Sequence, residues 1–139
     1  MSVALETANG GNLSIHLTGG ASAAAGGQGE VANPEGVTLF ITRATLIVNV
    51  TSTGSGTISC GVAASGGTFT DIINALEMGS LTSLPKAYNG HAMQNTTKTE
   101  ITAPARWDAT DVLGFTASAT LVGWDADLLV EYVRVPNEA

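Results

Sequence analysis

Alternation of apolar and polar residues is the main pattern along this chain, and it predicts β-strands. Leu13, Ile15 and Leu17 alternate with polar neighbours, which is typical of a half-buried strand over residues 13–18. Residues 37–50 give the strongest signal because they are rich in β-branched side chains, which suit a pleated surface. This segment is long, so we expect either a bend or the junction of two strands near residues 41–42.

The rest of the chain divides into shorter strands separated by turns rich in glycine, proline and aspartate. We predict further strands at residues 57–63, 99–107, 112–122 and 124–135, and turns at residues 33–36, 54–56, 66–67, 108–111 and 123. The turn at 54–56 is predicted to close a hairpin, and Pro104 makes 99–107 an edge strand. Residues 19–29 and 80–97 are predicted loops. Residues 71–78 are the one predicted helical turn, capped by Asp71 and ended by Gly79.

Seven or eight strands with one helical turn predict an all-β domain in which two antiparallel sheets pack face to face. We expect a β-sandwich of jelly-roll type. An immunoglobulin-like sandwich is the second choice, because the Cys…Trp…Cys framework of that fold is absent. Residues 13–139 form the predicted single domain. Residues 1–12 are polar with a glycine-rich end and are predicted to be an N-terminal arm that pairs with a neighbour, or a frayed terminus.

The chain is poor in charge and acidic, which narrows its partners. Only 12% of its 139 residues are charged, where about 25% is usual. Such a surface suits a subunit that is in contact with other proteins in an assembly. A neutral, threonine-rich sheet surface without any partner would have the same composition, so both interpretations stay open. The net charge is −7 with 5 Lys and Arg residues, so we expect no binding to nucleic acid. We find no signal peptide and no run of apolar residues that would cross a membrane, so synthesis in the cytoplasm is expected.

No motif of known chemistry occurs in the sequence. His16 and His91 lack the spacing of a zinc site, and no nucleophile motif is present. The pairs Asp108/Asp111 and Asp125/Asp127 suit turns, where aspartate bonds its own backbone, better than a calcium loop. Cys60 is the one cysteine and is predicted to be a buried small hydrophobic residue, with intermolecular pairing as the alternative. We therefore predict no catalytic residue, no metal and no cofactor.

The candidate interface residues are apolar side chains of the arm and two tryptophans beside turns: Met1, Val3, Leu5, Trp107 and Trp124. Tryptophan is enriched at binding hot spots and is also an ordinary core residue, so both roles stay open. A carbohydrate- or receptor-binding module is the rival function. Its stacking residues would be Trp107, Trp124, Tyr88 or Tyr132, with Asp108, Asp111, Asp125 or Asp127 as hydrogen-bond acceptors. A hydrolase is a third and weaker alternative.

Residues 41–50, 53–57 and 58–63 have the pattern of a strand, a hairpin of small residues and a strand that ends in Gly-Val-Ala. This order resembles a recurring segment of tailed-virus structural proteins, and the likeness continues at residues 71–79, at residues 121–123 and in the final strand at residues 128–132. The resemblance implies a phage-like virion protein, most simply a capsid decoration (cement) protein on the capsid surface, although a tail or spike subunit is an alternative. It also implies that the partner is the major capsid protein and that the chain is a homo-oligomer, with a trimer favoured. It implies no catalytic residue.

Overall fold

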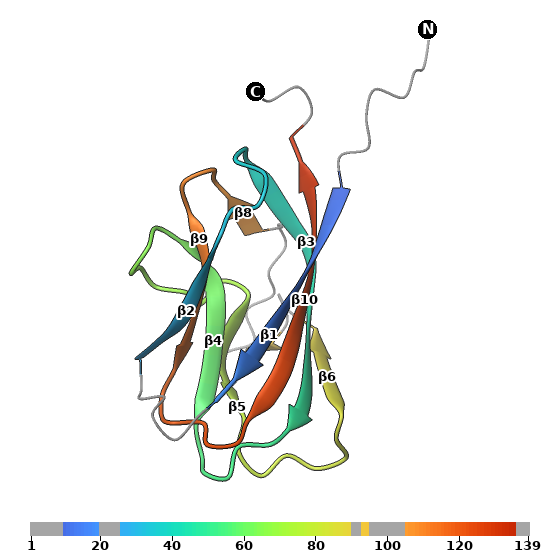
Figure 1. The fold of residues 1–139 in the computed structure, drawn as a ribbon, viewed down its shortest axis with the longest axis vertical. Coiled ribbons are helices and arrows are strands. Elements are labelled where there is room, and N and C mark those ends of the chain that lie inside the picture. The colour runs from blue at the N-terminus through green and yellow to red at the C-terminus, as the bar shows by residue number, and fades with distance from the viewer. Residues whose placement is uncertain (1–9, 20–25, 90–92, 95–104, 136–139) are drawn as a thin grey trace, which may run out of the picture.

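The computed structural model describes residues 10–19, 26–89, 93–94 and 105–135 and consists of two packed sheets (Figure 1). The first sheet has the order β1 (Gly10–Thr18), β10 (Asp125–Arg134), β3 (Leu39–Val50) and β6 (Lys86–Asn89), and β8 (Ala105–Trp107) pairs with the other half of β3. The second has the order β2 (Gly26–Ala32), β9 (Val112–Ala117), β4 (Thr57–Ala63), β5 (Ile73–Glu77) and β7 (Met93–Gln94). Neighbouring strands are antiparallel except β5 and β7, which are parallel.

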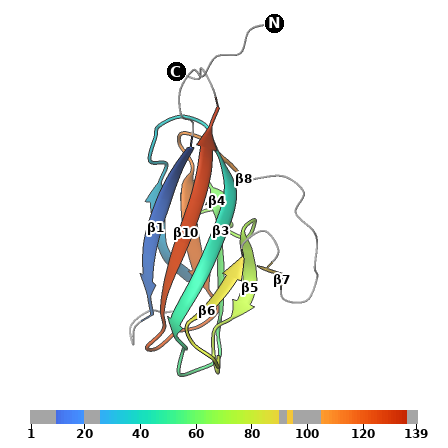
Figure 2. The same cartoon turned by 90° about the vertical axis from the view of Figure 1, so that its right-hand side faces the viewer.

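The two sheets lie face to face, and Figure 2 looks onto the first sheet with β1, β10, β3 and β6 side by side. Their inner faces supply the core. β3 contributes alternate residues such as Leu46 and Val48, β10 contributes Leu128 and Val130, and β9 contributes Leu113, each no more than 1% exposed. The prediction of an all-β sandwich is therefore confirmed, and the buried residues of β3 and β10 largely alternate along each strand.

Strand pairing is nested along the chain. β1 pairs with β10, β2 with β9, β3 with β6, and β4 with β5. Each pair of partners in this series is closer in sequence than the pair before. Successive pairs alternate between the two sheets, so the chain crosses from one sheet to the other after β1, β2 and β3. This topology brings the connection after β3 and the connection before β10 to the same end of the sandwich (Figure 1).

The predicted helical turn at residues 71–78 is wrong, because Ile73–Glu77 form β5 and pair with β4. Ala75 has a φ of 55°, which an α-helix does not allow. The register of β4 and β5 shifts between Ile58 and Cys60, as at a β-bulge, and the Ala75 N–H donates to Ser59 Oγ at 2.9 Å. A bulge interrupts the period-two alternation of a strand. The apolar residues of this segment therefore had a spacing that predicted a helical turn.

The predicted hairpin at residues 54–56 is also wrong, because β3 and β4 lie in different sheets. The irregularity expected near residues 41–42 is present as a register shift in one continuous strand: Ile41 pairs with Tyr132, Arg43 pairs with Glu131, and Thr42 is skipped. β8 is an edge strand, as predicted from the proline before it.

The number of strands in the described residues is ten, more than the seven or eight predicted. β2 begins inside the predicted loop at 19–29, and β6 and β7 lie inside the predicted loop at 80–97. Residues 10–12, assigned to the N-terminal arm from the sequence, are the start of β1, and the rest of the arm lies outside the described residues.

Candidate functional site: an uncharged end of the sandwich

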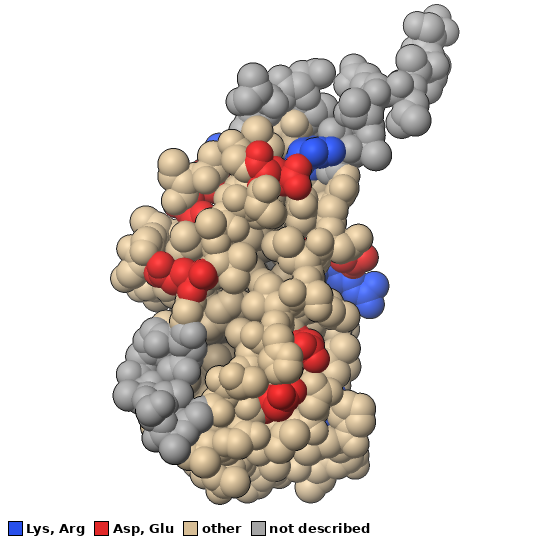
Figure 3. All heavy atoms as spheres, in the orientation of Figure 1, with Lys and Arg blue, Asp and Glu red and all other residues tan. Residues whose placement is uncertain are grey.

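Three segments meet at the end of the sandwich opposite the start of β1 and the end of β10 (Figure 1). They are residues 50–56, which begin with the last residue of β3, residues 79–85 between β5 and β6, and residues 118–124 before β10. None of them contains Asp, Glu, Lys, Arg or His. We call this surface the uncharged end. In Figure 3 the corresponding lower part of the molecule is almost entirely tan, while the red and blue groups lie higher.

Hydrogen bonds join the first and third of these segments. The Thr53 N–H donates to the Val122 carbonyl oxygen at 3.0 Å, and the Thr53 hydroxyl lies 3.3 Å from the same oxygen. The Trp124 N–H donates to the Leu121 carbonyl oxygen at 3.2 Å and closes the turn in which Gly123 has a φ of 75°. The backbone of Val122 is therefore fixed, while its side chain remains 40% exposed.

The second segment is fixed to the first in the same way. The Thr51 hydroxyl donates to the Met78 carbonyl oxygen at 3.0 Å and accepts from the Leu81 N–H at 2.9 Å. Ser52 forms an isolated parallel bridge with Gly79. Together these bonds make the uncharged end a rigid surface rather than a set of independent loops.

Two carboxylates border this end: that of Glu77, an exposed residue at the end of β5, and that of Asp125, which pairs with Val50. Glu77 Oε1 accepts hydrogen bonds from the N–H groups of Gly56 at 2.8 Å and Gly79 at 2.9 Å. A carboxylate oxygen shared by two backbone donors has much of its hydrogen-bonding capacity satisfied within the protein. Glu77 therefore supports the loops of the uncharged end, while its charge stays at the border of that surface.

The backbone at the uncharged end is also strained. Ser80 and Ser83 have φ values of 58° and 59°, in the left-handed region that serine seldom adopts. Such residues cost on the order of 1 kcal/mol each and persist where the surrounding structure holds them, commonly at functional sites. Exposed apolar side chains lie on the same surface: Val50 is 47% exposed and Val122 is 40% exposed.

The outer face of the first sheet carries a cluster of polar side chains formed by His16, Asn49, Asp125 and Asp127. His16 Nε2 lies 2.9 Å from Asp125 Oδ2, and His16 Nδ1 lies 3.7 Å from Asp127 Oδ1. Asn49 donates to both carboxylates at 3.0 and 3.1 Å. The hydrogen bonds from Asn49 and then His16 lower the pKa of Asp125. Because both ring nitrogens of His16 face carboxylates, neither is directed at a hydroxyl group that it could activate as a nucleophile.

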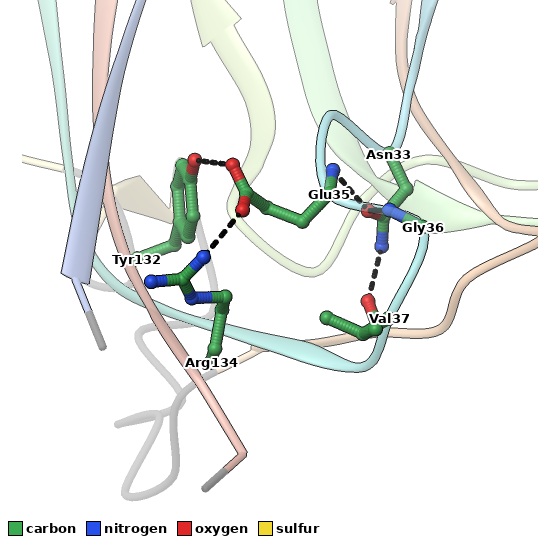
Figure 4. A network of polar contacts seen from close by, with 6 residues as sticks. All are labelled: Asn33, Glu35, Gly36, Val37, Tyr132 and Arg134. Atoms are coloured by element: carbon green, nitrogen blue, oxygen red, sulfur yellow. Dashed lines mark hydrogen bonds and ion pairs between the residues drawn. The ribbon is translucent and has the colours of Figure 1, made fainter. Parts of the chain in front are cut away.

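A network at the opposite end ties the β2–β3 connection to the end of β10 (Figure 4). Glu35 accepts a hydrogen bond from the Tyr132 hydroxyl at 2.9 Å and pairs with Arg134 at 2.8 Å. Asn33 Oδ1 accepts from the N–H groups of Glu35 and Gly36, which builds the turn predicted at residues 33–36. Burial, followed by the hydrogen bond and charge of Glu35, raises the pKa of Tyr132.

The structure places both predicted interface tryptophans in the core. Trp107 is 0% exposed and donates through Nε1 to the Asp111 carbonyl oxygen at 3.0 Å, and Trp124 is 3% exposed. The prediction that they form an interface is therefore wrong, and the core alternative holds, because both side chains belong to the buried core cluster. The other interface candidates, Met1, Val3 and Leu5, lie outside the described residues.

The residues of the rival binding module are not brought together. Tyr132 is 6% exposed, Tyr88 is half-buried with Lys86 Nζ 5.8 Å from its ring centre, and Asp108 pairs with Arg106 at 2.7 Å. Asp125 and Asp127 lie on the sheet face with His16. Trp107, Trp124 and Tyr132 are too deeply buried for a ligand to stack on their rings, and the ring of Tyr88 is half-buried.

Cys60 is buried at 0% exposure and is a free thiol, in agreement with its predicted place in the core, and burial raises its pKa. His91 lies outside the described residues. Within the described ranges, no group of three or more His, Cys, Asp or Glu residues could hold a metal ion. The same ranges hold no helix long and apolar enough to span a membrane.

A groove of about 600 Å³ lies on the outer face of the second sheet, lined by Gly29, Glu30, Gly66, Gly67, Phe69, Phe115 and Thr116. Glu30 is held at this groove, because its two carboxylate oxygens accept from the Ser65 hydroxyl at 2.6 Å and the Gly66 N–H at 2.7 Å.

Comparison with known proteins identifies no relative: no protein-family model, no curated protein and no solved structure matches this chain. The uncharged end was not found from the sequence, although the signal was present. Each of the three segments visibly lacks charge, but only the sheet topology shows that they meet on one surface.

Proposed function

We propose that this chain is a structural virion protein, a capsid decoration protein that binds the assembled shell of major capsid protein. The observation that carries the proposal is the uncharged end, a rigid surface with two exposed valines and no ionisable side chain in its three segments. A surface of this kind loses little hydration energy when another protein covers it. Because its loops are already fixed by hydrogen bonds, binding also costs little conformational entropy.

We also propose that the sandwich is a jelly roll. The support is the nested pairing of β1 with β10, β2 with β9, β3 with β6 and β4 with β5, distributed over two sheets. Jelly rolls are common in viral capsid domains and in lectins. The topology is compatible with the proposed function and does not by itself select it, because one fold serves many functions.

The proposed mechanism is thermodynamic. A protein that binds the assembled shell and not its dissociated subunits shifts the assembly equilibrium by mass action, by about 2.7 kcal/mol per site when its free concentration is a hundred times the dissociation constant. A homo-oligomer, of which the trimer is our expectation, would match the shell symmetry and add avidity. The proposed location is therefore the capsid surface of the virion, after synthesis in the host cytoplasm.

Charge placed on the uncharged end tests the proposal. Val122→Lys introduces a charge there, and Val133→Lys introduces the same charge at an equally exposed valine, since both side chains are 40% exposed. Val133 lies at the far end of β10 from the uncharged end. The probe is empty shells assembled from the major capsid protein encoded in the same genome, and the readout is co-sedimentation.

We expect Val122→Lys to reduce binding at least about ten-fold, because burying an unpaired charge costs more than 1.4 kcal/mol, and Val133→Lys to bind like the unchanged protein. Equal binding by both variants would show that the uncharged end is not the docking surface. Failure of the unchanged protein to bind the shells would contradict the proposed function itself.

A carbohydrate- or receptor-binding module remains the second candidate, and the groove beside Glu30 is the observation that favours it. Its lining differs from the residues expected from the sequence, and its two aromatic residues offer no stacking platform, because Phe69 is 4% exposed and Phe115 is a core residue at 2% exposed. Titration of the protein with simple sugars, followed by tryptophan fluorescence and repeated with Glu30→Gln, tests this candidate. Saturable binding that the variant loses would support it, and no response in the unchanged protein would remove its support.

A further inference from the structure

β1 is an edge strand without the features that usually protect such edges. It lies at one side of the first sheet, and β10 is its one partner among the described strands (Figure 2). All nine of its residues pair with β10 in unbroken register. Its sequence, GGNLSIHLT, contains no proline, lysine, arginine or carboxylate. Natural edge strands are commonly blunted by such residues, by bulges or by short length, because an open edge pairs readily with another strand.

The other edge strands in the described residues are blunted. β2 has an irregular register between Gly27 and Gly29 and carries Glu30. β6 has four residues and begins with Lys86, β8 has three residues and contains Arg106, and β7 has two residues. β1 is therefore the exception among the edges of this molecule.

The core is also incompletely covered along β1. The inward side chains Leu13, Ile15 and Leu17 pack against the core but are only partly buried. Their direct neighbours on β10 are Val130, Leu128 and Ala126, which are no more than 1% exposed. Burial falls sharply at the last strand, so a further strand beside β1 would remove apolar surface from water.

We propose that β1 pairs in antiparallel fashion with β1 of a second copy of this chain, about a two-fold axis at Ser14. When two copies of one strand pair in antiparallel fashion about a two-fold axis perpendicular to the sheet, one residue must lie opposite the same residue of the other copy. Choosing Ser14 as that residue overlaps the whole of β1, from Gly10 to Thr18. The contact joins the first sheets of two molecules into one continuous sheet.

This register is self-complementary at every position. On the inner face, Leu13 of each copy lies opposite Ile15 of the other, and Leu17 lies opposite Gly11. On the outer face, Asn12 lies opposite His16, and Ser14 meets Ser14. No carboxylate faces a carboxylate, although the chain has a net charge of −7. An edge that accepts its own sequence this well favours a second copy over a strand of a different protein.

The inference is independent of the proposed function, because it concerns self-association and needs no shell. A two-fold contact alone gives a dimer, and in larger assemblies it would join two oligomers. It is therefore distinct from the trimer that the resemblance to virion proteins implies.

Disulfide trapping tests the contact and its register in the full chain. Ser14→Cys places two thiols directly opposite one another, at a Cα separation of about 4.5 to 5.5 Å that a disulfide can span. Asn12→Cys is the matched control on the same face, because its two copies would be about 13 Å apart along the strand. The native Cys60 does not interfere, since it is 0% exposed.

We expect mild oxidation to convert most of the Ser14→Cys protein to a disulfide dimer on a non-reducing gel and to leave Asn12→Cys monomeric on that gel. Equal cross-linking of both variants, or of neither, would overturn the proposed register and contact.

A second experiment removes the contact without a new covalent bond. Ser14→Lys sets two like charges opposite one another, and we expect it to weaken self-association at least about ten-fold by analytical ultracentrifugation. Asn89→Lys, an exposed residue in the same cross-sheet row on β6, should leave association unchanged. A native mass that Ser14→Lys does not alter would overturn the proposal. The proposal would also be overturned if the unchanged protein were monomeric and Ser14→Lys abolished its binding to shells. That result would assign the β1 edge to a different partner.

Discussion

A single added methyl group at Gly114 should measurably destabilise the sandwich. Gly114 lies on the outer side of β9, between the inward Leu113 and Phe115, and Phe69 covers it. A Cβ atom at this position would lie 2.4 Å from two carbons of the Phe69 ring. Carbon atoms pack at about 3.5 to 4.0 Å, so the ring must retreat by more than about 1 Å.

The magnitude follows from the two routes open to that ring, which is 4% exposed. Strain in a crowded site costs about 1 to 3 kcal/mol. Release of the ring into water costs about 1.5 to 3 kcal/mol. Replacing glycine by alanine also lowers the conformational entropy of the unfolded chain, and this effect stabilises the folded protein by about 0.4 to 1 kcal/mol. We therefore expect Gly114→Ala to lower the free energy of unfolding by about 1 to 2 kcal/mol.

Urea unfolding followed by tryptophan fluorescence measures this difference, with Gly54→Ala as the control. No atom lies within 4 Å of the corresponding Cβ position at Gly54, so that variant should be neutral or slightly stabilising. A double-mutant cycle isolates the cause: in a Phe69→Ala background, Gly114→Ala should no longer destabilise. If its cost is the same with and without the Phe69 ring, the reasoning from this contact is refuted.

Two further predictions concern buried titratable groups. The pKa of Tyr132 is raised by burial and then by Glu35, so its contribution to stability is complete below the ordinary tyrosine pKa of about 10 and is lost as the pH rises through the higher folded value. Glu35→Gln should lower the pKa of Tyr132 in the folded protein, measured by tyrosinate absorbance in a Tyr88→Phe background. An unchanged pKa would show that Glu35 does not raise the pKa of Tyr132. Cys60 should resist a thiol reagent in the native protein and react fully after unfolding, because it is 0% exposed; rapid native labelling would contradict its burial.

The sequence predicts the central strands well because their pattern and their environment agree. β3 and β10 pair along ten positions in the middle of the first sheet, where one face is buried and the period-two alternation is clear. The edge strand β8 was predicted for a similarly local reason, the proline before it.

The errors have a common cause in non-local pairing. β2 is rich in glycine and has no strand pattern of its own, and it is a strand because β9 lies beside it. β5 contains a bulge that breaks the alternation. The hairpin after β3 was a local interpretation of a turn that instead carries the chain to the other sheet.

The candidate site could be predicted only in part. Charge poverty is a property of the whole sequence and pointed toward protein contacts, but the uncharged end depends on three segments separated by many residues. The tryptophans attracted an interface role because each adjoins a turn, whereas the sheet geometry directs Trp107 and Trp124 into the core.

The most direct test of the proposed function compares assembled and unassembled partner. The unchanged protein is mixed with empty shells of the major capsid protein encoded in the same genome, and separately with the same amount of that protein as dissociated subunits, and binding is measured by sedimentation. We predict saturable binding to the shells, little binding to the subunits, and shells that withstand higher denaturant concentrations once occupied. Absence of binding to the shells, or equal binding to shells and subunits, would contradict a role as a capsid decoration protein.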